Sequence, residues 1–374
     1  MSTITLYPLG NADTYRVDLP GGQKLLFDYA DMRCATDPTD KRAKLPDELR
    51  ADLKAAGRDR FDVVAFTHFD DDHVCGAASF FWLEHASKYQ GDGRIKIDEL
   101  WVPAWAITET KEDLCEDGKI LRAEARYRLE KGERVRVFSR PAKLEAWLNS
   151  RGLTLTSRQH LITDAGLYVP GWEPNNTKGL EMFVHSPFAH RQDDGTFDDR
   201  NTNCLIFQAS FRDGGGTTRA MLMGDTTYEC IADFVRITRF HGRIDRLKWD
   251  IVKLPHHSSY KSLGPEKGTT ETKPDSDVAD LYETYGDIKP RLVSSSKPIP
   301  SNDDDDQPPH RQAANYYKRI ARHKSGEYVV TMEHPSIAAP APLAIEIDWR
   351  GATVKKPGGS VGFAAVSTQA PRAG

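Results

Sequence analysis

The chain has 374 residues, of which 39% are hydrophobic and 28% are charged, and its formal net charge is -4 at pH 7. These totals are ordinary for a globular protein with a sizeable core, and they exclude a general electrostatic attraction to nucleic acid. The chain contains no run of about 18 apolar residues and no signal-peptide pattern, which argues against a membrane partner. The five scattered cysteines form no CxxC pair, so we expect reduced thiols and a cytoplasmic protein.

The spacing of apolar residues predicts strands and helices that alternate along both halves of the chain. The expected strands cover residues 4–7, 15–19, 24–28, 63–67, 99–102, 134–138, 181–184, 204–207, 220–223, 251–254, 291–294, 328–331 and 343–347. The expected helices cover residues 46–56, 77–89, 119–131, 227–239, 279–285 and 310–323. We expect one domain over residues 1–354, followed by a flexible tail over residues 355–374 that is rich in glycine, alanine, serine and proline.

A cluster of histidines and aspartates follows the apolar run at residues 63–67. It reads His68-Phe69-Asp70-Asp71-Asp72-His73. Imidazoles and carboxylates crowded at one strand end repel one another unless a cation lies among them. Carboxylate and imidazole ligands suit zinc, manganese or iron, whereas imidazole is a poor ligand for calcium. A solvated acidic loop is the ordinary alternative, but the flanking histidines and the buried strand favour a metal site.

Further candidate ligands follow strands in the second half of the chain. His185 follows residues 181–184, Asp225 follows residues 220–223, and a pair of histidines follows residues 251–254. Loops at the strand ends of two sheets can converge on one cleft. The pattern therefore predicts an α+β fold of the αββα sandwich type, with two mixed β-sheets flanked by helices.

These motifs resemble the metallo-β-lactamase superfamily, and in particular the hydrolase domain of ComEC-type competence proteins. The resemblance lies in three motifs, which here read His68-x-Asp70-x-Asp72-His73, Gly224-Asp225 and Pro255-His256-His257-Ser258-Ser259. The family versions are HxHxDH, Gly-Asp at a strand end, and Pro-His-His-Gly-Ser. Two departures stand out: Asp70 replaces a histidine, and Ser258 replaces a glycine.

The resemblance implies a metallo-β-lactamase fold with two divalent metal ions. Zn²⁺ is favoured, and Mn²⁺ or Fe²⁺ are the alternatives. The implied metal ligands are His68, Asp70, Asp72, His73, His185, Asp225 and His256. His68 and Asp70 would hold the first ion, Asp72 and His73 the second, and Asp225 would bridge both. His190 is the alternative to His185, and the choice between His256 and His257 stays open, with His256 preferred.

The implied activity is metal-dependent hydrolysis, in which a shared water loses a proton and attacks the substrate. Asp72 or Asp225 would orient this water or accept its proton, and His257 or His310 would protonate the leaving group. A phosphodiester, in a nucleotide or a nucleic acid, is the expected substrate, so the enzyme would be a phosphodiesterase or a nuclease. The alternatives are hydrolysis of a carboxylic ester, thioester, lactone or lactam, and a regulatory or binding protein with a degenerate metal site. A protein partner stays open.

The predicted helix at residues 119–131 is basic on one side, with Arg122, Arg126, Arg128 and Lys131. We expect a solvated face here. A patch that binds substrate phosphates is the alternative.

Overall fold

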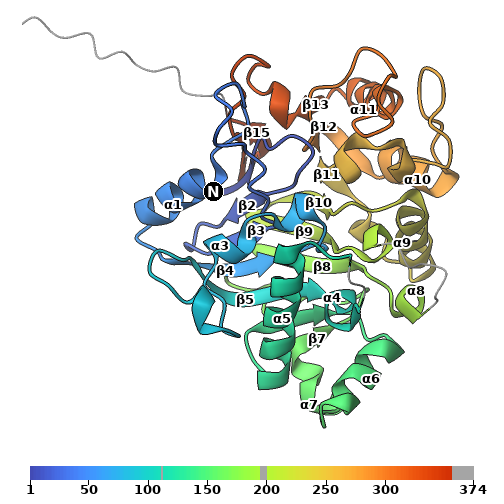
Figure 1. Cartoon of the computed structure of the whole chain (residues 1–374). Helices are drawn as coiled ribbons and strands as arrows, with labels where there is room; N and C mark the ends of the chain where they lie inside the picture. Colours follow the sequence, from blue (N-terminus) through green and yellow to red (C-terminus); the bar gives the residue numbers. More distant parts are fainter. Residues whose placement is uncertain (111–112, 194–199, 356–374) are drawn as a thin grey trace, which may run out of the picture.

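The computed structural model describes residues 1–110, 113–193 and 200–355, and within them the chain forms two mixed β-sheets (Figure 1). One sheet has the strand order β15-β14-β1-β2-β3-β4-β5-β6-β7, and the other has the order β13-β12-β11-β10-β9-β8. The strands are β1 (Ser2–Leu6), β2 (Tyr15–Asp18), β3 (Lys24–Phe27), β4 (Arg60–Ala65), β5 (Lys96–Pro103), β6 (Val135–Phe138), β7 (Ile162–Thr163), β8 (Leu180–Ser186), β9 (Ile206–Asp213), β10 (Gly216–Met223), β11 (Trp249–Lys253), β12 (Gly286–Ser294), β13 (Glu327–Val330), β14 (Leu343–Asp348) and β15 (Gly351–Val354).

Helices cover the outer faces of both sheets. The α-helices are α1 (Leu45–Ala55), α2 (Asp71–Val74), α3 (Ala77–Phe80), α4 (Ala104–Thr108), α5 (Glu116–Lys131), α6 (Ala142–Ser150), α7 (Leu155–Arg158), α8 (Ala189–Asp193), α9 (Tyr228–Phe240), α10 (Ser276–Glu283) and α11 (Arg311–His323). Short 3₁₀ turns join several of these elements, among them η3 (Arg200–Asn203) and η5 (His256–Ser258).

Three hydrophobic clusters correspond to the layers of this sandwich. The middle cluster lies between the sheets and joins residues such as Phe27 and Trp101 of the larger sheet to Phe207 and Leu222 of the smaller one. A second cluster packs α1 and α3–α6 on the larger sheet, and a third packs α9, α10 and α11 on the smaller sheet. The expected αββα sandwich is therefore confirmed. The boundary between domain and tail stays a prediction, because residues 356–374 lie outside the described part of the chain.

The predicted helix at residues 77–89 is wrong beyond its first turn. Helix α3 ends at Phe80, and Phe81 takes an extended conformation that forms a bridge to Ile95. The extended residue turns two consecutive rings inward, so that Phe80 and Phe81 both pack on Tyr29. In a helix, consecutive side chains point in different directions, so the rings of Phe80 and Phe81 could not both pack on Tyr29. Burial of both rings therefore favours the end of the helix at Phe80.

The basic face of α5 is largely engaged within the protein. Arg122 and Arg126 donate to the carbonyl oxygens of Ile107 and Glu109 at the end of α4, and Arg128 is buried in an ion pair with Glu124. The expectation of a solvated face is therefore wrong for these arginines. The N–H groups of Arg122 and Arg126 satisfy carbonyls that the end of α4 leaves unpaired, whereas Arg128 bonds to Glu124 and to carbonyls of Ile97 and Arg134.

The two sheets approach each other closely at the end of β10. A Cβ atom on Gly224 would lie 2.8 Å from Cβ of Thr67 and 2.9 Å from its Oγ1, although Thr67 follows β4 in the other sheet. The backbones are also joined directly, since Leu205 N–H donates to Thr67 O and Gly224 N–H donates to Leu205 O. Glycine at position 224 therefore sets how near the two sets of strand ends can lie.

We predict that Gly224→Ala lowers the free energy of unfolding by about 1–3 kcal/mol, because the added methyl group overlaps Thr67. Chemical denaturation followed by circular dichroism measures this. Gly91→Ala is the matched control, since a Cβ there meets no atom within 4 Å, and we expect a change within about 0.5 kcal/mol. Equal stability of the two variants would show that the sheets do not depend on this close approach.

Candidate metal centre

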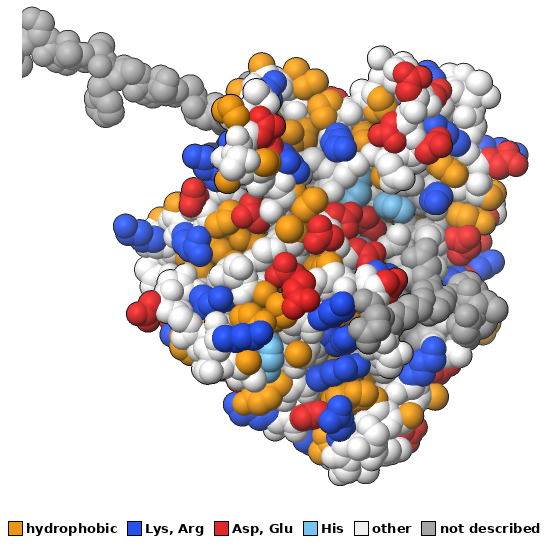
Figure 2. Space-filling model, in the orientation of Figure 1, with side chains coloured by type: hydrophobic (Ala, Val, Ile, Leu, Met, Phe, Trp, Pro, Cys, Tyr) orange, Lys and Arg blue, Asp and Glu red, His pale blue; other side chains and the backbone are white. Residues whose placement is uncertain are grey.

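Strand ends from both sheets meet in one cluster of histidines and carboxylates. In the larger sheet, β4 runs parallel to β3 and is followed by His73. In the smaller sheet, β10 and β11 run parallel, and Asp225 follows β10 while His257 follows β11. Asp72, His73, Asp225 and His257 each offer a ligand atom, and these atoms all lie within 4.8 Å of one another. Figure 2 shows acidic and histidine side chains beside one another near the middle of one face. These four residues are called the metal cluster below.

His73 presents one ring nitrogen to the cluster and uses the other to fix its ring. The Nδ1 atom lies 2.9 Å from Oδ2 of Asp28, and this carboxylate also accepts bonds from the N–H and hydroxyl of Thr67, each at 2.7 Å. Because a carboxylate accepts, Nδ1 carries the proton. The opposite atom, Nε2, is buried without a hydrogen-bond partner and lies 3.5 Å from Oδ1 of Asp225.

His257 has the same arrangement on the opposite side of the cluster. Its Nδ1–H donates to the carbonyl oxygen of Ser295 at 2.7 Å, and the ring is buried. The Nε2 atom lies 3.1 Å from Oδ2 of Asp72 and 3.2 Å from Oδ2 of Asp225. Histidines that bind metals commonly donate their other ring N–H to a carboxylate or a carbonyl, which orients the ring and makes Nε2 a better ligand.

The carboxylates and imidazoles of the cluster perturb one another strongly. Burial opposes a charge on His257, but Asp225 and Asp72 raise its pKa to about 10. Burial would raise the pKa of Asp72, yet His73 and His257 lower it to about 2. The pKa of Asp225 is likewise held well below its usual range by the two histidines, despite burial. The cluster is therefore built for positive charge between its carboxylates.

This geometry fits a divalent metal ion. Two imidazole Nε2 atoms and two carboxylates face one another, and the Nε2 atom of His73 is buried without a hydrogen-bond partner among the described residues. Mixed nitrogen and oxygen ligands of this kind suit zinc and neighbouring transition metals. Asp72 has a side chain that is 32% exposed, whereas the other three are at most 4% exposed. The open side of the site is therefore the side of Asp72.

The structure places His68 and Asp70 beside this cluster, but outside its ligand set. The ring centroids of His68 and His73 are 3.8 Å apart, and Nε2 of His68 lies 3.7 Å from Oδ2 of Asp70. The other oxygen of Asp70 accepts a hydrogen bond of 2.7 Å from Arg200, in the turn η3. Within the described residues, no third histidine, cysteine or carboxylate joins this pair to form a ligand group.

On sequence grounds we preferred His256 over His257 as the metal ligand, and the structure favours His257. The ring of His257 enters the cluster, whereas His256 contributes its backbone N–H, which donates to Oδ1 of Asp225 at 3.1 Å. The residues His256, His257 and Ser258 all have positive φ angles, of 47°, 52° and 62°. This left-handed run costs conformational energy in L-residues. It brings the ring of His257 into contact with Asp72 and Asp225, whereas the ring of His256 forms no ion pair with a carboxylate among the described residues.

Ser258 and His310 support this strained turn. The Ser258 hydroxyl lies 2.7 Å from the Ser294 hydroxyl, and its carbonyl accepts the backbone N–H of His310 at 3.1 Å. The ring of His310 accepts a bond from Tyr260 N–H at Nδ1 and donates from Nε2 to Asp306 O. With both ring nitrogens engaged, His310 lies where it holds the loop. Its predicted role as a proton donor stays a prediction.

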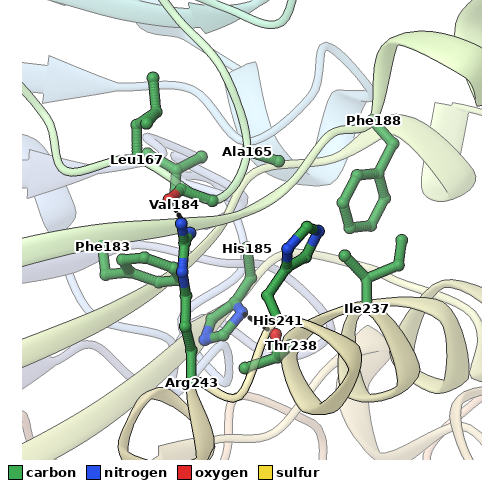
Figure 3. A pocket seen from close by; sticks show the side chains of 11 residues that line it. Ala165, Leu167, Phe183, Val184, His185, Phe188, Ile237, Thr238, His241 and Arg243 are labelled. Atoms are coloured by element: carbon green, nitrogen blue, oxygen red, sulfur yellow. Dashed lines mark hydrogen bonds between the residues drawn. The ribbon is translucent and has the colours of Figure 1, made fainter.

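His185 lies in another part of the smaller sheet. Its Nε2–H donates to Arg246 O at 2.8 Å, and Nδ1 lies 3.5 Å from the Thr238 hydroxyl (Figure 3). Burial lowers the pKa of His185 to about 4, so the ring is neutral. It lines a cavity of about 210 Å³ with Leu167, Phe188 and other residues that are not in the metal cluster. The structure therefore does not bring His185 to the predicted ligands. His190, the alternative, is exposed on α8.

Several residues around the cluster were not predicted from the sequence. Asp28 orients His73, and the buried Lys253 forms an ion pair with the buried Asp13, whose Oδ2 lies 3.9 Å from Nε2 of His73. Asp28 ends a predicted strand that runs beside the one carrying the His-Asp motif. That adjacency, together with the likeness of Phe27-Asp28 to the same family, was the sequence signal for it.

Comparisons with known proteins reveal similarity in structure only. No protein-family model matches the chain, and no curated protein matches it. Similar solved structures include a diphosphatase of the PhnP family (10% identity, TM-score 0.35, covering 93% of this chain and 99% of that one). A metallo-β-lactamase-like protein of Thermotoga maritima has 15% identity and a TM-score of 0.30, and the coverage is 66% of this chain and 86% of that one. A class B3 di-zinc metallo-β-lactamase from an Alaskan soil metagenome has 11% identity and a TM-score of 0.32, with coverage of 86% and 88%.

No comparison bears on the ComEC-type resemblance, which stays a prediction. Among the described residues, none of the helices combines the length and the apolar character that a membrane span requires.

We predict that His257→Ala removes metal binding, whereas His256→Ala retains it, because only the ring of His257 enters the cluster. Isothermal titration with Zn²⁺ measures both affinities, and we expect a loss of more than about 100-fold for His257→Ala. The two variants have adjacent positions and equal changes in composition, so each is the control for the other. Stronger weakening by His256→Ala would contradict this placement of the rings.

We also predict that metal uptake releases protons and weakens as the pH falls. Without a bound ion, His257 is protonated at neutral pH because its pKa is raised to about 10, and it must lose that proton to bind the ion. Titration calorimetry in buffers of different ionisation enthalpy measures the released protons. A binding enthalpy independent of the buffer would show that no proton is displaced.

Proposed function

We propose that the protein is a metal-dependent hydrolase whose substrate is a phosphodiester. The observation that carries the proposal is the paired orientation of His73 and His257, whose Nδ1–H groups donate outward while both Nε2 atoms face Asp225. This arrangement orients two imidazoles and two carboxylates toward one position, where a divalent ion would displace the imidazole protons. Zn²⁺ is the favoured ion, with Mn²⁺ and Fe²⁺ as alternatives.

Four residues of this chain would hold the ion, namely Asp72, His73, Asp225 and His257. A bound ion supplies Lewis-acid chemistry, since it polarises a phosphoryl oxygen and makes water more acidic. Asp72 is the most exposed of the four, so it can contact a water that approaches from solvent and accept its proton. Asp28 and the Ser295 carbonyl hold the imidazole rings in place.

The choice of a phosphodiester over a carboxylic ester rests on two observations. The segment Pro255–Ser259 resembles the motif of ComEC-type hydrolases, and the guanidinium of Arg200, which is bonded to Asp70, lies beside the acidic site. Cationic groups near the reacting centre stabilise the charge of a phosphoryl group in its transition state. A nucleotide or a nucleic acid would supply such a bond.

We predict slow but measurable hydrolysis of bis(p-nitrophenyl) phosphate that a chelator abolishes and added Zn²⁺ or Mn²⁺ restores. Asp28→Asn should lower kcat/KM by about 10–100-fold, because it weakens the bond that orients His73. Release of p-nitrophenolate, followed by absorbance, measures both effects.

His241→Gln is the control for this experiment, since His241 is exposed at the end of α9, and its activity should match the wild type. Hydrolysis of p-nitrophenyl acetate or a lactone in place of the phosphodiester would support a carboxylic ester substrate. A metal-loaded protein inactive on all of these substrates would contradict the proposal and favour a binding protein.

A further inference from the structure

The carboxylates around the metal cluster divide into those that have a cationic partner and those that have none. Asp13 pairs with the buried Lys253, and Asp70 pairs with Arg200. Asp72 and Asp225 have no lysine or arginine partner among the described residues, and they are the two that face the Nε2 atoms. The partners of these two carboxylates are therefore the imidazoles of His73 and His257, which carry a counter-charge only when they are protonated.

Arg200 lies beside the metal cluster, where it is held by contacts with Asp70, Asp113 and Trp105. Its Nη1 atom donates to Oδ1 of Asp70 at 2.7 Å, its Nη2 atom donates to Asp113, and its guanidinium lies 5.5 Å from the ring centre of Trp105. The side chain is 16% exposed, so it is largely removed from solvent. Arginine suits such a place, because its planar guanidinium stays charged and can bond to a carboxylate while it stacks on an aromatic ring.

We propose that the site binds a single divalent ion, and that the Arg200 guanidinium takes the place of a second ion at Asp70. This inference rests on the proposed metal-dependent function. It differs from the expectation of two ions, for which His68 and Asp70 would have to act as ligands. A second divalent cation at Asp70 would lie against the guanidinium, and two positive charges at such short range repel each other in a partly buried site.

The geometry around His68 supports the same conclusion. The ring of His68 is buried against His73, and its Nδ1 lies 3.1 Å from the hydroxyl of Thr67. Its Nε2 has Asp70 at 3.7 Å as a neighbouring carboxylate, and Asp70 is already bound to Arg200. His68 thus packs beside the ligand His73, and the one carboxylate that the described chain places within ion-pair distance of its Nε2 is already bonded to Arg200.

The test is the metal content of desalted protein after incubation with excess Zn²⁺, measured by elemental analysis against protein concentration. We expect one ion per chain in the wild type and in Asp70→Asn, because Asp70 is not a ligand. Asp225→Asn, which removes a charge from the cluster itself, should contain far less than one ion. Arg200→Gln frees Asp70 of its counter-charge, and we expect its content to exceed one ion per chain.

Electron paramagnetic resonance of the Mn²⁺-loaded wild type gives a second reading, in which we expect isolated ions and not coupled pairs. Two ions in the wild type, or a lower content in Asp70→Asn than in the wild type, would overturn the inference. A content that stays at one in Arg200→Gln would overturn the role given to the guanidinium. Failure of the proposed function looks different, because the wild type would then either retain almost no metal or carry its ion without hydrolysing the substrates tested above.

Discussion

The orientation of two imidazole rings is the constraint on which the site depends. His73 and His257 come from different sheets, yet each donates its Nδ1–H to a fixed acceptor outside the cluster, Asp28 in one case and Ser295 O in the other. Both Nε2 atoms must then face the same two carboxylates. Nitrogen lone pairs that face carboxylate oxygens in a buried site are unfavourable unless a proton or a metal ion lies between them.

The fold produces this orientation through the ends of its parallel strands. Strands β3 and β4 carry Asp28 and the His-Asp motif to one edge of the larger sheet, and β10, β11 and β12 carry their residues to the facing edge of the smaller sheet. The close approach of Gly224 to Thr67 joins the two edges. Thr67 also donates to Asp28, so the contact between the sheets and the hydrogen bonds that orient His73 share one residue.

Much of the fold could be predicted from the sequence, because periodicity reports burial directly. The strands around the site and the helices at α1, α5, α9, α10 and α11 lie close to their predicted positions. The helix predicted at residues 77–89 was wrong because two neighbouring phenylalanines pack on one tyrosine. Periodicity cannot show a tertiary contact of this kind.

The motifs that form the candidate site could be predicted from the sequence, but the role of each residue within them could be predicted only in part. The His-Asp motif, Asp225 and the histidine pair were identified, since unusual residue types at strand ends stand out in the sequence. The choice of His257 over His256 depends on a left-handed turn, which the preferred conformations of histidine and serine do not suggest. Arg200 is 130 positions from Asp70, and His185 is an ordinary strand residue whose neighbours only the fold reveals.

The most direct measurement of the central claim is a crystal structure of Zn²⁺-loaded protein with anomalous diffraction data collected at the zinc absorption edge. We expect one anomalous peak, bounded by Nε2 of His73, Nε2 of His257 and the carboxylates of Asp72 and Asp225. An empty cluster, or a peak bound by His68 and Asp70 with Arg200 displaced, would contradict it.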